Sequence, residues 1–216
     1  MLVLALDTSS AAVTVALAEV DEDVLPRAQR AVVNAKGHGE LLAPTIAACF
    51  ADASAKPADI AAVVAGLGPG PYTGLRVGLV TAAAMADALG VPTYGVCSLD
   101  AIAPSAQDEG DLIVVTDARR KEVYWARYDA DGKRSDGPHV DKPNDVPRVR
   151  DYAGAGVSLY PDIFGIALGD DYPDPVVLIA VARERIVSGA AAEALTPLYL
   201  RHPDAVVPGA PKQVSQ

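Results

Sequence analysis

The sequence predicts an α/β fold in two lobes, in which mixed sheets are flanked by helices. Three observations support this. Short apolar, β-branched runs alternate with alanine-rich stretches that contain no proline. A glycine-rich stretch, residues 66–78, joins one such run to one such helical stretch. Half of the 216 residues are hydrophobic, which is enough to form a substantial core and excludes general disorder.

The first lobe begins with strands. Residues 2–6 form an almost unbroken apolar run, typical of a strand that is buried on both faces. Turn-forming residues at 7–10 precede an alternating stretch at 12–19, which predicts an antiparallel return strand with Asp7 at the tip of the hairpin. A third strand is predicted at 24–33. Three strands are therefore expected before the first helix.

Helices and strands alternate in the rest of this lobe. Residues 38–50 predict an amphipathic helix, because apolar residues recur at intervals of three and four, although Pro44 is unfavourable there. The following elements are predicted in this order: a strand at 60–65, a helix at 75–89, a strand at 93–97 and a helix that begins at Ser98 as its N-cap. The order βββαβαβα resembles the ribonuclease-H-like lobe of actin-like proteins and sugar kinases.

A second, smaller lobe is predicted after Pro104, which divides the chain into domains 1–104 and 105–216. Strands are predicted at 111–116 and 123–128, with a turn between them at 117–121. The later predictions are turns at Asp131-Gly132 and Asp136-Gly137, a proline-broken variable loop at 138–147, a helix at 180–188 and a flexible tail after Arg201.

The glycine-rich stretch allows two interpretations. Glycine lets the backbone come close to another group, and the first turn of the next helix offers free N–H groups, so the loop suits an anion. Alternatively, the glycines only allow a helix to begin close to the sheet, in a turn stiffened by Pro69 and Pro71. The spacing matches neither the P-loop motif nor the dinucleotide fingerprint.

Composition limits the function classes. The formal net charge of −10 would repel nucleic acid, so a free-standing tRNA binder is not expected. Cys49 and Cys97 stand in apolar surroundings and predict buried core residues, in keeping with a reducing cytosol. The chain begins without a basic leader and contains no apolar run of about 20 residues, so we expect a cytoplasmic protein without a membrane anchor.

Four stretches carry a family resemblance. They are Gly68-Pro69-Gly70-Pro71-Tyr72-Thr73-Gly74-Leu75-Arg76-Val77-Gly78, Leu6-Asp7-Thr8-Ser9, Asp117–Tyr124 and Pro197–Arg201. The first resembles the glycine-loop motif of the TsaB (YeaZ) family of tRNA threonylcarbamoyladenosine biosynthesis proteins, whose usual form is GPGSFTGLRIG. Pro71, Tyr72 and Val77 depart mildly from that form. The four stretches keep the order of the family, so the resemblance spans nearly the whole chain.

This resemblance implies a two-lobe actin-like (ribonuclease-H-like) ASKHA fold and a non-catalytic role. The chain is expected to be a scaffold or activator that pairs with a TsaD-like catalytic subunit, which attaches threonylcarbamoyl to the tRNA adenosine next to the anticodon. A TsaE-like ATPase is expected in the assembled complex, and tRNA is expected to be reached only through it. The resemblance leaves open a homodimer of the isolated chain.

The parts of an actin-like nucleotide site are present only partially. In actin-like ATPases an aspartate at the first hairpin holds the metal of the nucleotide through water, but Asp7 would serve equally well in an Asx turn. The second phosphate hairpin of such enzymes is rich in glycine, whereas residues 117–121 contain none. Weak binding of ATP or ADP with magnesium stays open, and its candidate residues are Asp7, Thr8, Ser9, Gly68, Gly70, Thr73 and Gly74.

Two other functions stay open on the sequence. An independent ATPase or kinase would use Asp7 and the glycine loop, and micromolar ATP binding with turnover would identify it. A metallopeptidase is disfavoured, because His38, His139 and His202 stand far apart and no predicted helix offers two closely spaced ligands. We assign no catalytic residue and no metal ligand.

In the TsaB family, pairing uses two helices of the first lobe, here 38–50 and 75–89. Alanine-rich positions in the second helix allow close helix approach. The predicted interface residues are His38, Leu41, Leu42, Thr45, Arg76, Leu79, Ala82, Ala83 and Ala86. Among these, Leu42, Leu79 and Ala83 are predicted to face away from their own sheet.

Overall fold

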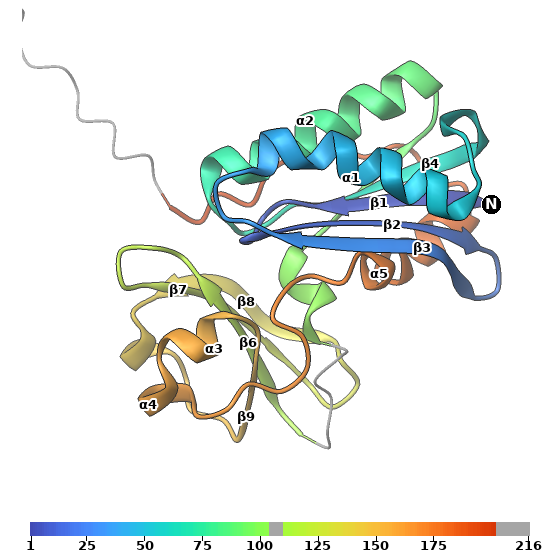
Figure 1. Ribbon diagram of the computed structural model, residues 1–216. Coiled ribbons are helices and arrows are strands. Elements are labelled where there is room, and N and C mark those ends of the chain that lie inside the picture. The colour runs from blue at the N-terminus through green and yellow to red at the C-terminus, as the bar shows by residue number, and fades with distance from the viewer. Residues whose placement is uncertain (104–109, 202–216) are drawn as a thin grey trace, which may run out of the picture.

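Two sheets define two lobes in the computed structural model, which describes residues 1–103 and 110–201 (Figure 1). The sheet of the first lobe has the order β3-β2-β1-β4-β5. Its strands are β1 at Leu2–Asp7, β2 at Ala12–Val20, β3 at Val24–Val33, β4 at Ile60–Gly66 and β5 at Thr93–Val96. Strands β1, β2 and β3 are antiparallel neighbours, whereas β4 runs parallel to both β1 and β5. The predicted order of three strands before the first helix is confirmed.

Two helices cover one face of this sheet (Figure 1). Helix α1 spans His38–Ala53 and α2 spans Tyr72–Leu89, so each is slightly longer than predicted. Pro44 is tolerated within α1 on its exposed side. Helix α2 ends at Gly90, which adopts the left-handed conformation that glycine accepts without strain. Among the described residues, no helix combines the length and the apolar character needed to cross a bilayer.

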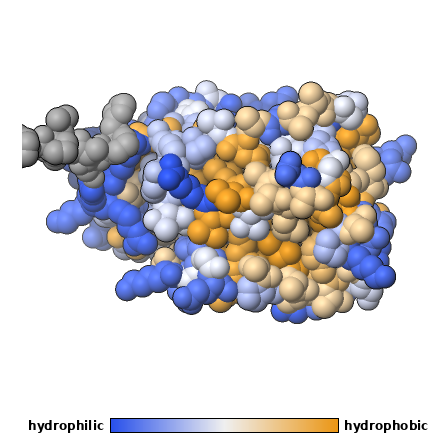
Figure 2. Space-filling view, turned by 90° about the horizontal axis from the view of Figure 1, so that it is seen from above, coloured by the Kyte–Doolittle hydropathy of each residue, from blue (hydrophilic) through white to orange (hydrophobic). Residues whose placement is uncertain are grey.

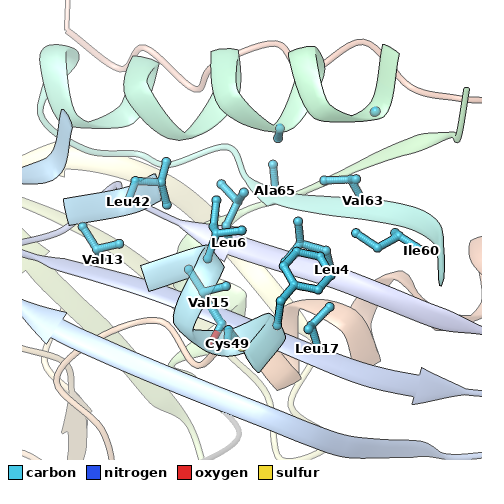
Figure 3. Packing of buried hydrophobic residues seen from close by; sticks show 14 of the residues in the cluster. Leu4, Leu6, Val13, Val15, Leu17, Leu42, Cys49, Ile60, Val63 and Ala65 are labelled. Carbon is cyan, nitrogen blue, oxygen red and sulfur yellow. Dashed lines mark hydrogen bonds between the residues drawn. The ribbon is translucent and has the colours of Figure 1, made fainter. Parts of the chain in front are cut away.

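The core lies on both sides of the central strands. Figure 3 shows Leu4 and Leu6 of β1 beneath the helices, where they join Leu42 and Cys49 of α1 in one apolar cluster. Every second residue of β1 points the other way, so Val3 enters a different cluster. The unbroken apolar run at 2–6 is explained by this burial on both faces.

Helix α5, Pro175–Val187, covers the second face of the first sheet. Its buried residues Leu178, Ile179 and Ala182 pack against the strands of the first sheet, all of which end at or before Val96. The predicted division at residue 104 therefore needs correction, because the chain returns to the first lobe after it has built the second. The local sequence pattern of α5 did not reveal that this helix packs on the first lobe, because the apolar face of a helix does not specify which sheet it covers.

The second sheet repeats the plan of the first with fewer strands. Its order is β8-β7-β6-β9, with β6 at Leu112–Asp117, β7 at Val123–Tyr128, β8 at Arg134–Asp141 and β9 at Asp151–Ala153. The three long strands are antiparallel neighbours and β9 is parallel to β6, as β4 is to β1. Two short helices follow, α3 at Gly156–Leu159 and α4 at Pro161–Phe164. The ribonuclease-H-like strand order thus occurs in both lobes.

Two local predictions are wrong, and a third concerns residues outside the described part of the chain. Asp136-Gly137 is not a turn, because both residues belong to β8, where Gly137 has a φ of +94°. Ser98 does not cap a long helix: the element is a single turn, Ser98–Ala101, and its N-cap is Cys97. The predicted tail after Arg201 lies outside the described residues.

Polar side chains cross the junction between the lobes, from the buried Tyr128 to the exposed Arg134. Tyr128 of β7 donates its hydroxyl hydrogen to Asp100 Oδ1 at 2.8 Å, and Arg134 Nε lies 3.1 Å from the same carboxylate. Burial raises the pKa of the Asp100 carboxyl, and it raises the pKa of the Cys97 thiol to about 12. Cys97 is thus a buried thiol, as its apolar surroundings in the sequence predict.

Candidate functional site

Asp7 lies at the end of β1, at the centre of a buried hydrogen-bond cluster. Its Oδ1 accepts hydrogen bonds from the Ser9 N–H at 2.7 Å and from Ser9 Oγ at 2.8 Å. Ser98 Oγ donates to Asp7 Oδ2 and accepts from the Gly68 N–H at 3.0 Å. The Ser98 N–H donates in turn to the Gly68 carbonyl at 2.8 Å. The cluster joins the first strand to the beginning of the glycine loop.

The Asp7 carboxyl is shielded from solvent, with 1% of the residue exposed. Burial raises its pKa above the ordinary value of 3.8, although hydrogen bonds from Ser98 and Ser9 and the charge of His38 act in the opposite direction. The folded protein therefore retains this proton to a higher pH than the unfolded chain does. The contribution to stability is largest below pH 3.8 and is lost as the pH rises through the folded-state pKa.

Asp7→Asn is expected to change the pH dependence of stability more than any intrinsic catalytic rate. Because the variant has no carboxyl to ionise, its free energy of unfolding should fall less than that of the wild type between pH 4 and pH 7. Thermal unfolding over this range measures the difference. Asp52→Asn is the control: the Arg30 hydrogen bond lowers the Asp52 pKa below 3.8, so this carboxylate is ionised throughout the range and the slope of the variant's profile should match that of the wild type. Parallel profiles for Asp7→Asn and wild type would contradict the assignment.

Thr8 attaches the same strand end to α2. Its hydroxyl donates to the Gly74 carbonyl at 2.7 Å and accepts from the Gly78 N–H at 3.0 Å. A Cβ at Gly78 would lie 2.4 Å from Thr8 Oγ1, and a Cβ at Gly70 would lie 2.0 Å from the Ser9 carbonyl oxygen. The helix and its loop approach the hairpin this closely because those positions are glycine. These contacts favour the packing interpretation of the glycine loop.

A cleft of about 290 Å³ lies between the lobes. The hairpin after β1, the turn after β6 and the loop around α3 form its walls, and its lining includes Ser9, Ser10, Thr116, Asp117, Ala155 and Asp171. In an actin-like fold this is the expected place for a nucleotide. Of the candidate nucleotide residues, however, only Ser9 lines the cleft.

The turn after β6 uses two of its backbone N–H groups within the turn itself. Arg119, Arg120 and Lys121 all have positive φ, at 64°, 53° and 62°, which is unfavourable for residues other than glycine. The Arg119 N–H donates to Asp117 Oδ1 at 2.7 Å, and the Ala118 N–H donates to the backbone carbonyl that closes the turn. These two N–H groups are therefore not available to an anion at this turn.

The structure brings six of the seven candidate nucleotide residues together. Asp7, Thr8, Ser9, Gly68, Gly70 and Gly74 are buried around the hairpin, whereas Thr73 is exposed on the first turn of α2. Sequence reasoning missed Gly66 and the role of Ser98, both of which touch the Asp7 side chain. Whether a nucleotide binds stays a prediction. Within residues 1–103 and 110–201, no group of three or more His, Cys, Asp or Glu side chains is arranged to hold a metal ion.

The outer surface of α1 and α2 forms a second candidate site. The two helices lie side by side over the first sheet, and Figure 2 shows an extended apolar surface on the face seen from above. We define the helix face as the exposed small and apolar residues Ala43, Pro44, Ala47, Val80, Ala83 and Ala84. Val80 is 66% exposed. A contiguous apolar surface of this kind is typical of an interaction site.

The predicted interface residues divide between the inside and the outside of the chain. Leu41 is half-buried, Arg76 and Ala83 are exposed, and the others are buried: His38, Leu42, Thr45, Leu79, Ala82 and Ala86. The prediction that Leu42 and Leu79 face away from their own sheet is therefore wrong. Apolar residues at intervals of three and four mark the inward stripe of a helix, so the residues that predicted the helices are those that the sheet buries.

His38 has an internal role. It begins α1, and its Nε2 donates a hydrogen bond to the Ser10 carbonyl at 2.8 Å. This contact fixes the start of the helix against the hairpin that carries Asp7. The residue is 8% exposed and is not part of the helix face.

Comparison with known proteins matches residues 31–159 to the family described as "TsaD: tRNA N6-adenosine threonylcarbamoyltransferase". TsaB of Escherichia coli is 28% identical, over 94% of this chain and 95% of that protein. The structure of YeaZ from Pseudomonas aeruginosa superposes with a TM-score of 0.74 at 26% identity, covering 92% of this chain and all of the other. This chain belongs to the TsaB (YeaZ) branch of the matched family.

The TsaB-family relatives of this chain differ in length. A protein of Mycobacterium leprae is 48% identical over 94% of this chain, which spans only 56% of that relative. The chain thus covers about half of the M. leprae protein but nearly all of E. coli TsaB. Both the matched family segment and the E. coli alignment include the glycine loop and the helix face.

Proposed function

We propose that this protein acts in the biosynthesis of threonylcarbamoyladenosine on tRNA, as a non-catalytic subunit that pairs with a TsaD-like catalytic subunit. The helix face carries the proposal, because it leaves an apolar surface uncovered on the outside of two helices. The names of the TsaB relatives supply the process. The buried state of Asp7 supports an accessory role over nucleotide turnover in this chain.

The choice of partner rests on fold likeness. The TsaD family segment, residues 31–159, includes both α1 and α2. A TsaD-like subunit can therefore present two equivalent helices, and two such faces can pair about a pseudo-twofold axis as subunits of a dimer do. Small residues at Ala43, Ala47, Ala83 and Ala84 allow the helices to approach closely. A TsaE-like ATPase is proposed as a further component of the assembled complex.

Val80→Glu and Ala83→Glu test the pairing. Both side chains are exposed, so the isolated chain should fold, whereas a charge in a desolvated interface should weaken association by at least about tenfold. Co-expression with the TsaD-like subunit of the same organism, followed by size-exclusion chromatography, measures the complex. Val181→Glu is the matched control, because it places the same charge on the exposed side of α5, across the sheet.

The outcomes of these experiments distinguish the pairing of the two subunits from the role in tRNA modification. Retention of the complex by both charged variants would move the interface elsewhere. Loss of the modified nucleoside from tRNA on deletion of the gene, and its return with the wild-type chain but not with Val80→Glu, would support the whole proposal. Unchanged modification after deletion would overturn the assigned process. The same chromatography over a concentration series tests for a homodimer of the isolated chain.

A further inference from the structure

A further cavity lies beside the cleft between the lobes and outside the helix face. It has a volume of about 580 Å³, twice that of the cleft between the lobes, and falls in the usual range of small-molecule sites. Three separate parts of the chain form it: the start of α2, the turn between β6 and β7, and the segment 199–201. We call it the tyrosine-arginine pocket.

Tyrosine rings form one wall of this pocket. Tyr72 at the start of α2 stacks on Tyr199, with ring centroids 5.3 Å apart and an angle of 26° between the planes. Tyr72 is 52% exposed and Tyr199 is 42% exposed, so part of each side chain is open to solvent. Tyr124 lines the pocket from β7. Partly exposed aromatic rings provide a surface against which a planar ring can pack.

Guanidinium groups converge on the same pocket. Arg76 lies over the Tyr72 ring at 3.9 Å, and its Nε donates to the Tyr199 hydroxyl at 2.8 Å. Within the part of the chain that the structure describes, no carboxylate pairs with Arg76. Arg119, Arg120 and Arg201 also line the pocket, in a protein whose net charge is −10. Positive side chains are therefore concentrated locally, against the overall charge.

Two of these arginines pair with carboxylates of residues that do not line the pocket. Arg119 Nη1 lies 3.2 Å from Asp117, and Arg201 pairs with Glu122, but neither carboxylate residue lines the pocket. A guanidinium group is planar, stays ionised and can give two parallel hydrogen bonds to a phosphate group. The contacts of Arg76 with Tyr72 and Tyr199 hold its guanidinium group beside this aromatic surface.

From this geometry we propose that the tyrosine-arginine pocket binds a nucleoside phosphate, with the base on the tyrosine wall and the phosphate at the arginines. Base stacking on an aromatic side chain and phosphate pairing with arginine are the contacts that single nucleotides make in proteins. The pocket shares Pro71 and Arg119 with the cleft between the lobes, but its other lining residues are its own, and it does not depend on pairing through the helix face. The nucleoside phosphate comes either as a free nucleotide or as one residue of an RNA strand.

Calorimetric titration of the full chain tests the pocket with defined probes. AMP should bind saturably, while adenosine, which has no phosphate, and ribose 5-phosphate, which has no base, should each bind at least about tenfold more weakly. Arg76→Gln and Tyr72→Ala should each weaken AMP binding by a similar factor. Arg27→Gln is the matched control, since Arg27 is an exposed arginine paired with Glu19 and does not line the pocket.

A further variant and a further probe locate the bound ligand and identify its source. Ser158→Trp obstructs the cleft between the lobes and should leave AMP binding unchanged. Loss of binding in Ser158→Trp but not in Arg76→Gln would put the ligand in the cleft and overturn the proposal. Penta-adenylate that binds more tightly than AMP supports an RNA source, and equal or weaker binding supports a free nucleotide. Absence of saturation by both AMP and penta-adenylate at millimolar concentration, or equal binding of AMP and adenosine, would also overturn it.

Discussion

Gly66→Ala is expected to lower the free energy of unfolding by about 3 kcal/mol or more, because the new methyl group has no room. A Cβ at this position would lie 1.8 Å from Asp7 Oδ2 and 2.6 Å from Ser98 Oγ. Strand β4 cannot move away easily, since β1 and β5 pair with it on either side. The Asp7 side chain must therefore leave its hydrogen bonds. Chemical denaturation measures the loss.

Two controls locate the effect of Gly66→Ala. Gly39→Ala, in α1, meets no atom within 4 Å and should leave stability about unchanged or slightly higher, because alanine favours helices. In the background of Asp7→Ala, Gly66→Ala should cost much less than it does alone, since the clashing carboxylate is gone. Simple additivity of the two changes would show that the strain lies elsewhere.

Leu178→Ala is expected to destabilise the protein by about 2–5 kcal/mol, the usual range for deleting a buried leucine. Leu178 is 0% exposed and lies in the cluster that joins α5 to the underside of the first sheet. Val181→Ala is the matched control on the same helix, because Val181 is 44% exposed, and it should cost less than about 1 kcal/mol. Thermal or urea unfolding compares the two variants. Equal losses would show that α5 does not pack as described.

Strands and helices that are determined by the local sequence pattern could be predicted from the sequence. The strand predicted at 24–33 and the strand predicted at 123–128 have those bounds in the structure, because turn residues on either side mark their ends. The helix predicted at 38–50 continues three residues further, to Ala53. These elements depend on periodicity and on nearby turn chemistry, both of which one sequence records.

Features that depend on contacts between distant segments could not be predicted in the same way. Ser98 has the residue type of a helix cap, yet its hydroxyl bonds Asp7, 91 residues earlier. Strand β8 includes Gly137-Pro138, a sequence that ordinarily ends a strand, and pairing with β7 overrides that tendency. The glycine loop was recognised, but its position against Ser9 and Thr8 required the structure.

The candidate sites also contain some features that could be predicted from local sequence and others that depend on contacts between distant segments. The Asp7 hairpin and the glycine loop were assigned to one candidate nucleotide site, and the structure brings them together. Of the three residues predicted to face outward from α1 and α2, only Ala83 does so, because a periodic apolar pattern reports the buried side of a helix. Tyr72 and Tyr199, which are 127 positions apart, could not have been placed in one pocket without coordinates.

The late return of α5 has a consequence for synthesis on the ribosome. Strands β1 to β5 are made first, but the helix that covers their second face is made only after the whole second lobe. At ordinary translation rates this interval is on the order of ten seconds, whereas helices and hairpins form in microseconds. During that time Val3, Val64 and Val96 have no cover. Completion of the first lobe is therefore paced by elongation of the nascent chain, and a chain arrested before residue 175 exposes this surface to chaperones and proteases.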